Sequence, residues 1–516
     1  MKPPACVLLG VDSSTQSTKA VFVDASTGEV LAQGRAPHTV EGVAGARESD
    51  PEMWWQALRS AVAAGLDALA RHGAGPDSVA GLAVAGQQHG LVVLGRDGRP
   101  LRPALLWNDT RAAPQAAALA GALGGPAMWS ARTGSVPVAS FTAAKWLWLR
   151  RDDPGTAARC AAVRLPHDFL TERLCGEAVT DPGDASGTGW YDTRLGAYDP
   201  EVLDLIGLHP GLLPAVAPAG GSRVGALTRA AGEFLGLPPG IPIAAGTGDN
   251  MAAAVGLGLG ASGLLGHPVL SLGTSGTAFT VTAARPRTAG LPQVAGFAAT
   301  DGCHLPLACT LNCTLAVETM SRLLGLDRED TAPGGEVVLL PYLDGERTPD
   351  LPGAAGLLTG LRHTSTPRQL LGAAYEGAVF TLLRALDDVL LSCGLDPGDP
   401  GTAALPLLLV GGGAAGPAWR DTVRRLSGRP LVLPGRTEPV ALGAAALAAG
   451  ATGGDPVAVA RSWGTGAATE LPAVERDTET WERIGSVLAD ARDLLAERRP
   501  ADPRPGRRDL PRPPRP

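Results

Sequence analysis

The sequence predicts an α/β protein with two similar domains that face each other across a cleft. Short apolar runs alternate with patterns typical of helices, which indicates mixed sheets covered by helices. A strand, a loop of small polar residues and a second strand open both halves of the chain, about 260 residues apart. The length of 516 residues is enough for two or three domains of about 150 residues each.

In the first half, the apolar runs and the turn residues between them predict five strands and one helix. The strands are expected at 6–11, 19–23, 29–35, 79–85 and 91–94. A small-polar loop at 12–18 and a turn at 24–28 separate the first three strands. Asp50 and Pro51 are typical of a helix start, and apolar residues at helical spacing extend that helix to about His72.

The second half repeats this order of elements. Strands are expected at 269–272, 277–282 and 405–410. Thr366 is a typical N-cap and Pro367 a typical first-turn residue, so they begin a helix that runs to about Ser392. A helix of small residues follows at 438–449. From Pro500 the chain is rich in proline and arginine, and we expect a disordered tail.

Composition excludes several classes of protein. With 45% apolar and 18% charged residues, the chain is not a disordered polyelectrolyte. A formal charge of −7 gives no reason to expect a nucleic-acid binder. Seven scattered cysteines and a short apolar run at the N-terminus predict reduced thiols and no signal peptide, hence a cytoplasmic protein. The stretch 251–284 lacks charged residues, but its glycines and Pro268 predict a buried helix followed by strands, not a membrane span.

The loop after the first strand carries small hydroxyl side chains between Ser13 and Thr18. Such a loop offers N–H and O–H donors that converge on one point, as phosphate oxygens require. Asp12, at the end of the strand, would supply a carboxylate to a magnesium ion. An ordinary hairpin turn with solvated serines is the alternative interpretation, and this loop alone does not decide between the two.

A second loop of the same kind, Ser271-Leu272-Gly273-Thr274-Ser275-Gly276-Thr277, follows the strand that opens the second half. Two such loops at the starts of two similar domains would hold the phosphates of one nucleotide from both sides. The sequence has no G-x-x-x-x-G-K-[ST] motif, so the P-loop mechanism is absent. Gly258 and Gly260 lack a preceding strand, so a dinucleotide-binding fingerprint is not expected.

A third feature is an apolar strand at 241–245 that ends in Gly246-Thr247-Gly248, with Asp249 at the start of a small-residue helix. The glycines let a substrate approach the backbone closely, and the carboxylate projects beyond the strand. As a general base, Asp249 would accept a proton from a substrate hydroxyl that attacks a γ-phosphoryl group. As an N-cap it would be purely structural, and residue type alone leaves both interpretations open.

Taken together and in this order, the three motifs resemble those of the FGGY carbohydrate kinases. Three further segments are similar to those of the xylulokinases within that family: Gly-Gln-Gln-His-Gly at 86–90, Leu-Trp-Asn-Asp at 106–109 and Pro-Tyr-Leu-Asp-Gly-Glu-Arg-Thr-Pro at 341–349. The resemblance runs from about Cys6 to about Ala449, which is most of the chain.

The resemblance implies an α/β fold of two ribonuclease-H-like domains of the actin and Hsp70 type, with ATP and a sugar in the catalytic cleft between them. The chain then divides into an N-terminal domain with the sugar site at 1–260, a C-terminal domain with the nucleotide site at 261–465, a helical extension at 466–499 and the tail at 500–516. The implied reaction is the ATP- and Mg²⁺-dependent phosphorylation of D-xylulose to D-xylulose 5-phosphate. L-Ribulose, gluconate or glycerol is the nearest alternative substrate. An actin- or Hsp70-like ATPase that binds proteins is the alternative of a different class.

The same resemblance assigns the candidate site residues. Asp249 is the expected general base, and Asp12 is the expected acid beside the metal and the phosphates. The expected sugar contacts are Gln88, His89, Trp107, Asn108, Asp109 and Asn250. The expected ATP contacts are Ser14, Thr15, Gln16, Gly273, Thr274, Gly412 and Gly413. The expected partners are the sugar and ATP, without nucleic acid or membrane, and a homodimer is a possible assembly.

Some of these residues also have a structural interpretation. His89 closely follows a buried strand, so a core histidine with satisfied hydrogen bonds is the alternative to a sugar contact. Glu346 and Arg347 are interpreted as an ion pair between the domains. The chain also departs from the family pattern where Gln88 replaces a frequent methionine, His167-Asp168 a frequent Lys-Asp, and Ala415-Gly416 a common Arg-Ser.

Overall fold

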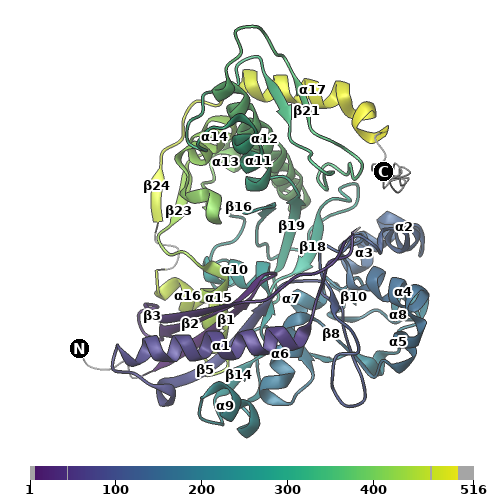
Figure 1. Cartoon of the computed structure of the whole chain (residues 1–516), viewed down its shortest axis with the longest axis vertical. Coiled ribbons are helices and arrows are strands. Elements are labelled where there is room, and N and C mark those ends of the chain that lie inside the picture. Colours follow the sequence, from purple (N-terminus) through teal and green to yellow (C-terminus); the bar gives the residue numbers. More distant parts are fainter. Residues whose placement is uncertain (1–5, 44, 465–467, 498–516) are drawn as a thin grey trace, which may run out of the picture.

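Two seven-stranded mixed sheets, each covered by helices, form the framework of the protein (Figure 1). The structure is a computed structural model that describes residues 6–43, 45–464 and 468–497. The sheet built from the earlier part of the chain lies in the lower half of Figure 1, and the sheet built from the later part lies in the upper half. The predicted α/β fold with two similar domains is confirmed.

The first sheet contains five of the strands that the sequence predicts. Its members are β1 (Val7–Ser13), β2 (Ser17–Asp24), β3 (Val30–Pro37), β5 (Val79–Gly86), β13 (Arg223–Ala226), β14 (Pro242–Ala244) and β15 (Thr247–Gly248). The strand order is β13-β14-β5-β1-β2-β3, and β15 pairs with the end of β5. β1 runs parallel to β5 and antiparallel to β2. The ends of the predicted strands differ from the observed ones by a few residues.

The second sheet repeats the first. Its strands are β16 (Val269–Leu272), β17 (Gly276–Phe279), β18 (Ala295–Ala298), β19 (His304–Thr310), β22 (Leu407–Val410), β23 (Leu431–Pro434) and β24 (Ala468–Leu471). Their order is β18-β19-β17-β16-β22-β23-β24. From β19 to β24, the order and the relative directions of the strands are those found from β3 to β13 in the first sheet. The two halves therefore share one architecture, as the repeated strand-loop-strand order predicts.

Long helices cover the sheets at the positions that the sequence predicts. α1 (Pro51–Ala70) packs against β2 and β3 and buries the apolar stripe that begins at Trp54. Asp50 is its N-cap, because the Asp50 side chain accepts a hydrogen bond from the next turn. α12 (Pro367–Ser392) packs against β17 and β19, and Thr366 starts it in a capping box.

Two helices of small residues, α10 (Asp249–Gly256) and α15 (Pro439–Gly450), pack against each other and against the face of the first sheet opposite α1. Their approach is close, because a Cβ atom on Gly443 would lie 1.8 Å from the carbonyl oxygen of Ala252. α10 is the buried helix predicted within 251–284. α15 belongs to the later part of the chain but covers β1 and β5, so this contact joins the two halves. The division of the chain at 260 and 465 stays a prediction.

A helical lobe between β5 and β13 was not predicted. Its helices are α2 (Ala113–Gly121), α3 (Pro126–Thr133), α4 (Thr142–Asp152), α5 (Pro154–Arg159), α6 (Pro166–Cys175), α7 (Pro182–Ala185) and α8 (Pro200–Ile206). Much of the lobe lies at the lower right of Figure 1 and has its own core around Trp129, Trp146 and Trp190. The helices are short and their apolar residues are weakly periodic, so the sequence pattern does not separate them from loops.

The remaining elements are short, apart from one helix at the far end of the second domain. The strands are β4 (Glu48–Ser49), β6 (Val92–Leu94), β7 (Ala104–Leu105), β8 (Ala162–Arg164), β9 (Val179–Thr180), β10 (Tyr191–Asp192), β11 (Ala197–Tyr198), β12 (Ala215–Val216), β20 (Val338–Leu340) and β21 (Leu357–Thr359). The helices are α9 (Arg229–Leu235), α11 (Thr314–Leu324), α13 (Pro400–Ala403), α14 (Pro417–Ser427), α16 (Pro456–Ser462) and α17 (Thr478–Glu497). Within the described residues, no helix has the length and apolar character needed to cross a membrane. The predicted tail at 500–516 lies outside the described residues.

Candidate active site

The ends of the central strands of both sheets line a shared cavity of about 350 Å³. From the first domain the wall includes Thr15, Gln88, His89, Trp107, Asp249 and Asn250. From the second domain it includes Ser271, Gly273, Ser275, Thr277, Arg347 and Gly411. Residues predicted for the sugar and for the phosphates therefore meet in one place, and the predicted cleft between the domains is present.

Asp249 is the first residue of α10, directly after β15. Gly248 occupies the N-cap position, so the interpretation of Asp249 as the N-cap is wrong. Asp249 Oδ1 accepts hydrogen bonds from the backbone N–H of Asn250 at 2.8 Å and from Asn250 Nδ2 at 3.0 Å. Asn250 Nδ2 also donates to Gln88 Oε1 at 2.8 Å. The acid and two predicted sugar contacts thus form one hydrogen-bonded group on the cavity wall.

Two carboxylates at the strand ends have raised pKa values. Burial, together with the negative charges of Asp12 and Asp184, raises the pKa of Asp249 to about 7. Burial also raises the pKa of Asp12, although Ser14 Oγ donates to its Oδ1 at 2.6 Å and the charge of Lys19 opposes the shift. A carboxylate whose pKa lies near neutral pH is suited to proton transfer.

His89 is held in an uncommon backbone conformation, with a φ of 65°. Its ring stacks on Phe141 at a centroid distance of 5.2 Å and packs against Phe297 at 5.6 Å. Burial lowers the pKa of His89 to about 3, so the imidazole is neutral. Nδ1 lies 2.7 Å from the carbonyl oxygen of Gly187 and donates to it, which leaves Nε2 as an acceptor.

Lys145 on α4 fixes the backbone of His89 from behind. It is fully buried, and its Nζ donates to the carbonyl oxygen of His89 at 2.8 Å and to that of Ser140. Thr142 Oγ1 donates to the same His89 oxygen at 3.3 Å. Burial lowers the pKa of Lys145 to about 7. The sequence analysis did not single out this residue, and the available signal was a lysine within an apolar helical stretch.

A buried charged cluster lies behind the ends of β5 and β15. His167 Nδ1 is 2.8 Å from Asp184 Oδ2, and His167 Nε2 is 3.2 Å from Asp168 Oδ1 and 3.8 Å from Asp181 Oδ1. Burial alone lowers the pKa of His167, but the three carboxylates outweigh it and raise the pKa to about 9. His167 is therefore a cation, so the departure from Lys-Asp preserves a positive charge. Gly86 packs directly on His167, because a Cβ atom on Gly86 would lie 2.9 Å from the backbone nitrogen of His167.

The segment at 106–109 reaches the cavity only through Trp107. Trp107 Nε1 donates to Thr15 Oγ1 at 3.0 Å, and both side chains line the cavity. Asp109 instead accepts hydrogen bonds from the backbone N–H of Arg47 and from the side chain of Arg111. Neither Asn108 nor Asp109 is part of the cavity wall.

Some of the predicted ATP contacts line the cavity and others do not. Thr15 and Gly273 line the cavity, whereas Ser14, Gln16, Thr274, Gly412 and Gly413 do not. The glycine turn after β22 reaches the cavity through Gly411, which has a φ of 87°. A Cβ atom on Gly411 would lie 2.6 Å from the carbonyl oxygen of Leu272, so only glycine allows β22 and β16 to end so close together.

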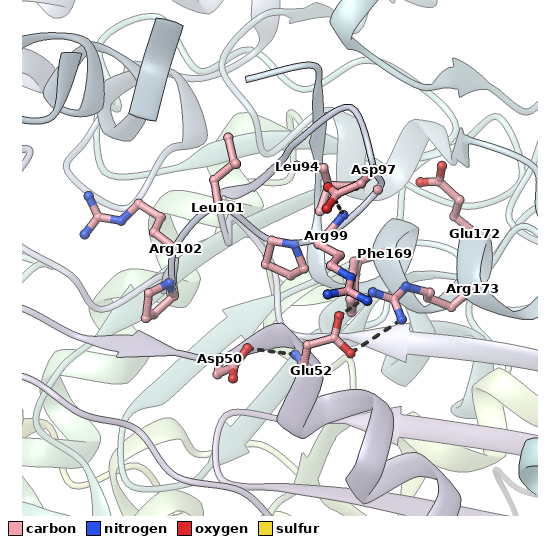
Figure 2. A pocket seen from close by; sticks show the side chains of 13 residues that line it. Asp50, Glu52, Leu94, Asp97, Arg99, Leu101, Arg102, Phe169, Glu172 and Arg173 are labelled. Atoms are coloured by element: carbon pink, nitrogen blue, oxygen red, sulfur yellow. Dashed lines mark hydrogen bonds and ion pairs between the residues drawn. The ribbon is translucent and has the colours of Figure 1, made fainter. Parts of the chain in front are cut away.

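A larger cavity, of about 720 Å³, lies elsewhere on the first domain. Figure 2 shows that side chains of both charges line it, with Glu52 and Arg173 facing each other as an ion pair. The Arg173 guanidinium also lies over the ring of Phe169. None of the predicted site residues belongs to its wall. The cavity between the domains is therefore the candidate active site.

One expectation about the second domain is wrong. Glu346 and Arg347 do not form an ion pair, because the Glu346 carboxylate accepts hydrogen bonds from N–H groups of Leu311, Asn312 and the Arg347 backbone. The Arg347 side chain lines the cavity instead. Arg347 is not among the predicted site residues, because two opposite charges adjacent in the chain suggest an ion pair.

Two family models match the chain. The N-terminal domain of the FGGY family of carbohydrate kinases matches residues 7–256, and the C-terminal domain of the same family matches residues 269–452. The chain belongs to the FGGY family of carbohydrate kinases. The resemblance of the motifs at the strand ends is thereby confirmed, and the activity of a carbohydrate kinase implies a sugar and ATP as substrates.

Named relatives agree with that family. The xylulose kinase of Streptomyces coelicolor is 56% identical over 492 residues, which cover 95% of this chain and 97% of that protein. The xylulose kinase of Streptomyces rubiginosus is 55% identical over 95% of this chain and 97% of its own length. The xylulose kinase of Escherichia coli is 33% identical over 85% of this chain and 89% of that protein.

Solved structures share the fold. A xylulose kinase from Bifidobacterium adolescentis, 32% identical, superposes with a TM-score of 0.76 over 94% of this chain and 99% of that one. A gluconate kinase from Lactobacillus acidophilus, 21% identical, reaches a TM-score of 0.82 over 95% and 98% of the two chains. The second match shows the fold alone, so fold similarity does not distinguish sugar substrates within the family.

Proposed function

We propose that this protein transfers the γ-phosphoryl group of ATP to the terminal hydroxyl of D-xylulose and forms D-xylulose 5-phosphate, with Asp249 as the general base. The observation that carries the proposal is the identity of 55–56% to two xylulose kinases over 95% of the chain. The cavity supports it, because a carboxyl group with a pKa of about 7 lies there beside amide, imidazole and indole side chains that suit a sugar.

On the sugar side, Asp249 accepts the proton of the attacking hydroxyl. Asn250 holds Asp249 Oδ1, and Oδ2 accepts no hydrogen bond within the described chain, which leaves it for the substrate. Gln88 holds Asn250, so the base and a sugar contact share one rigid arrangement. The neutral imidazole of His89 accepts a hydrogen bond from a sugar hydroxyl at Nε2, and Trp107 supplies an apolar wall.

On the phosphate side, the second domain supplies neutral donors. The residues Ser275 and Thr277, with their hydroxyls, and the glycines Gly273 and Gly411 line the same cavity as Asp249. Such donors stabilise the negative charge of phosphate oxygens and of the transferring group. Of the other expected ATP contacts, Thr15 lines the same cavity. The expected contacts outside the cavity wall stay predictions: Ser14, Gln16, Thr274, Gly412 and Gly413.

Asp12 is the residue that would hold Mg²⁺. Its Oδ1 is bonded to Ser14, and its Oδ2 accepts no hydrogen bond within the described chain. Mg²⁺ is commonly bound by one or two carboxylates together with water and substrate phosphates, and this donor set fits that pattern. The described residues contain no cluster of three or more His, Cys, Asp or Glu side chains that could hold a metal. The ion would neutralise charge on the phosphates.

A panel of substrates, with ADP release as the readout, tests this proposal. D-Xylulose should give the largest kcat/KM, and L-ribulose, gluconate and glycerol smaller values. Glycerol leaves Gln88 and His89 unpaired at about 1–3 kcal/mol each, so roughly 30-fold discrimination or more is expected. Faster turnover of another substrate would refute D-xylulose as the preferred sugar. ATP hydrolysis that no sugar stimulates would favour the actin-like ATPase.

A cytoplasmic location and a homodimer stay predictions. Cell fractionation tests the location, and light scattering during gel filtration tests the assembly. A monomer across micromolar concentrations would contradict the homodimer without affecting the proposed reaction.

A further inference from the structure

The loop at 341–349 is rigidly tied to the second domain just before Arg347. Glu346 is only 1% exposed, and its carboxylate accepts four hydrogen bonds. They come from the backbone N–H groups of Leu311, Asn312 and Arg347, at 2.6, 3.3 and 2.7 Å, and from Asn312 Nδ2 at 3.1 Å. The Glu346 carboxylate therefore binds three backbone N–H groups and one amide side chain, and it does not pair with the Arg347 guanidinium.

The chain is fixed on the other side of Arg347 as well. Thr348 is 4% exposed, and its Oγ1 donates to the carbonyl oxygen of Cys309 on β19 at 2.8 Å. The Arg347 guanidinium, in contrast, makes no hydrogen bond or ion pair within the described part of the chain, although it is partly buried and lines the cavity. The hydrogen bonds of Glu346 and Thr348 fix the backbone on both sides of Arg347, while its guanidinium has no partner. This arrangement is typical of a preorganised ligand contact.

Arg347 lines the same cavity as the expected sugar contacts Gln88 and His89. Burial is the main cause that lowers the pKa values of His89 and Lys145, and the positive charge of Arg347 lowers both further. Lys145 itself is bonded to the backbone of His89. Arg347 and His89 line the same cavity, one from each domain.

The chemistry of a guanidinium restricts what it binds there. It donates through five N–H groups in a fixed fork and accepts no hydrogen bond. It therefore suits oxygens that only accept, such as the carbonyl oxygen of a ketose or the oxygens of a phosphoryl group. Arg347 shares the cavity with His89, which the proposed function places on the sugar, and this favours the ketose over the transferring group.

We propose that Arg347 is a specificity-determining residue, which donates hydrogen bonds from the second domain to the C2 carbonyl oxygen of the ketose. The inference rests on the proposed function, because it requires a ketose bound at Gln88 and His89. A pentitol carries a hydroxyl in place of this carbonyl and is a poorer partner for a donor-only fork. Arg347 thereby separates ketoses from polyols of the same length.

Titration calorimetry without ATP tests the proposal directly, with D-xylulose and its C2-reduced form, xylitol, as the two probes. The wild-type protein should bind D-xylulose more tightly than xylitol. In Arg347→Ala, the Kd for D-xylulose should rise by about 10–100-fold, the range expected for lost hydrogen bonds to a charged donor. The Kd for xylitol should rise less, so that the two values converge. Arg347→Lys keeps the charge without the fork and should fall between the wild type and the alanine variant.

Two controls separate binding from folding and from the nucleotide. The melting temperature of Arg347→Ala should stay at the wild-type value, since the guanidinium has no partner to lose, and KM for ATP should change less than about two-fold. Arg99→Ala, at the other cavity, is the matched arginine variant and should change neither Kd (Figure 2).

Other outcomes would overturn the proposal. An unchanged Kd for D-xylulose in Arg347→Ala excludes a sugar contact. If kcat and the slow hydrolysis of ATP without sugar fall while that Kd is unchanged, Arg347 acts on the phosphoryl group. Equal losses for D-xylulose and xylitol would mean that Arg347 does not recognise the carbonyl. A wild-type protein that does not bind D-xylulose would refute the proposed function itself, and this inference with it.

Discussion

The two small-polar loops at the strand ends are alike in sequence and differ in how their hydroxyls are used. In the first loop the hydroxyls have partners within the protein: Ser13 with Thr18, Ser14 with Asp12, Thr15 with Trp107 and Ser17 with Arg35. In the second loop, the side chains of Ser271, Thr274, Ser275 and Thr277 make no hydrogen bond within the described chain. The two loops follow corresponding strands of one duplicated architecture.

This difference indicates that the hydroxyls of the two loops have different roles. Hydroxyls that are already paired fix the geometry around Asp12 and Trp107, whereas unpaired hydroxyls are available to the oxygens of a ligand. Charge is divided in the same way, because the first sheet ends in Asp12 and Asp249 and the second ends in glycines and hydroxyls. The proposed function assigns proton transfer to these acids of the first domain and phosphate binding to the neutral donors at the strand ends of the second.

Replacing Asp249 by asparagine should remove the main chemical function of the first domain. Asparagine keeps the shape and can accept the hydrogen bonds from Asn250, but it does not take up the hydroxyl proton. We expect kcat with D-xylulose and ATP to fall by about 10²–10⁴-fold, the usual loss for a general base. In the wild type, kcat/KM should fall as the pH drops through about 7, because the Asp249 carboxylate becomes protonated.

The stability of the same variant should change in the opposite direction. The folded-state pKa of Asp249 is about 7 against an ordinary value of 3.8, so at pH 8 the buried charge lowers the free energy of unfolding. Each unit of such a shift corresponds to about 1.4 kcal/mol. Asp249→Asn should therefore melt at a higher temperature than the wild type at pH 8, and the gain should shrink as the pH falls toward 4. A variant that stays active, or that melts lower at pH 8, would make Asp249 a structural residue.

Removing the His167 cation behind the ends of β5 and β15 should have the next largest effect, a loss in the free energy of unfolding. His167→Ala leaves Asp168, Asp181 and Asp184 buried without their positive partner. Breaking a buried charged network in this way costs about 3–5 kcal/mol, which urea unfolding at pH 7 would measure. His167→Lys keeps a cation at this position and is the matched control, so it should retain most of the wild-type stability.

The dependence on pH distinguishes these variants. The pKa of His167 is raised from 6.5 to about 9, so its stabilising charge is fully present below pH 6.5 and is lost as the pH rises through 9. Lysine keeps its charge to a higher pH, so His167→Lys should lose less stability than the wild type between pH 7 and 9. Identical losses in the two proteins would show that His167 is not the group that titrates.

Much of the fold could be predicted because its signals are local. Apolar runs bounded by small polar turns located β1, β2, β5 and β16, and Asp50 and Thr366 marked the starts of long helices. The helical lobe could not be predicted in this way, because residues such as Trp129 and Trp146 become a core only when several short helices meet. Tertiary packing, and not local propensity, forms those helices.

The candidate site shows the same limit at the level of single residues. Gln88, His89 and Asp249 follow strands, and the carboxyl ends of parallel strands meet at one edge, so their convergence was predictable. Lys145 and Asp184 reach the site from the lobe, whose position the sequence does not define. That Arg347 is unpaired depends on Glu346 turning to the backbone at 311–312, which no sequence spacing reveals.

The smallest expected effects test the comparison of the two loops directly, by removing one hydroxyl from each. Ser275→Ala deletes an unpaired hydroxyl, so we expect an unchanged melting temperature and a loss of about 10-fold in kcat/KM for ATP, from one lost hydrogen bond to a charged ligand. Thr15→Val deletes the acceptor of Trp107 Nε1 and should lower the free energy of unfolding by about 0.5–1.5 kcal/mol, with a smaller change in kcat/KM for ATP. Thr15→Ser, which keeps the hydroxyl, should restore the stability. The comparison fails if Ser275→Ala and Thr15→Val change the same quantity, either both the free energy of unfolding or both kcat/KM for ATP. The difference in hydrogen bonding between the two loops would then have no consequence for phosphate binding.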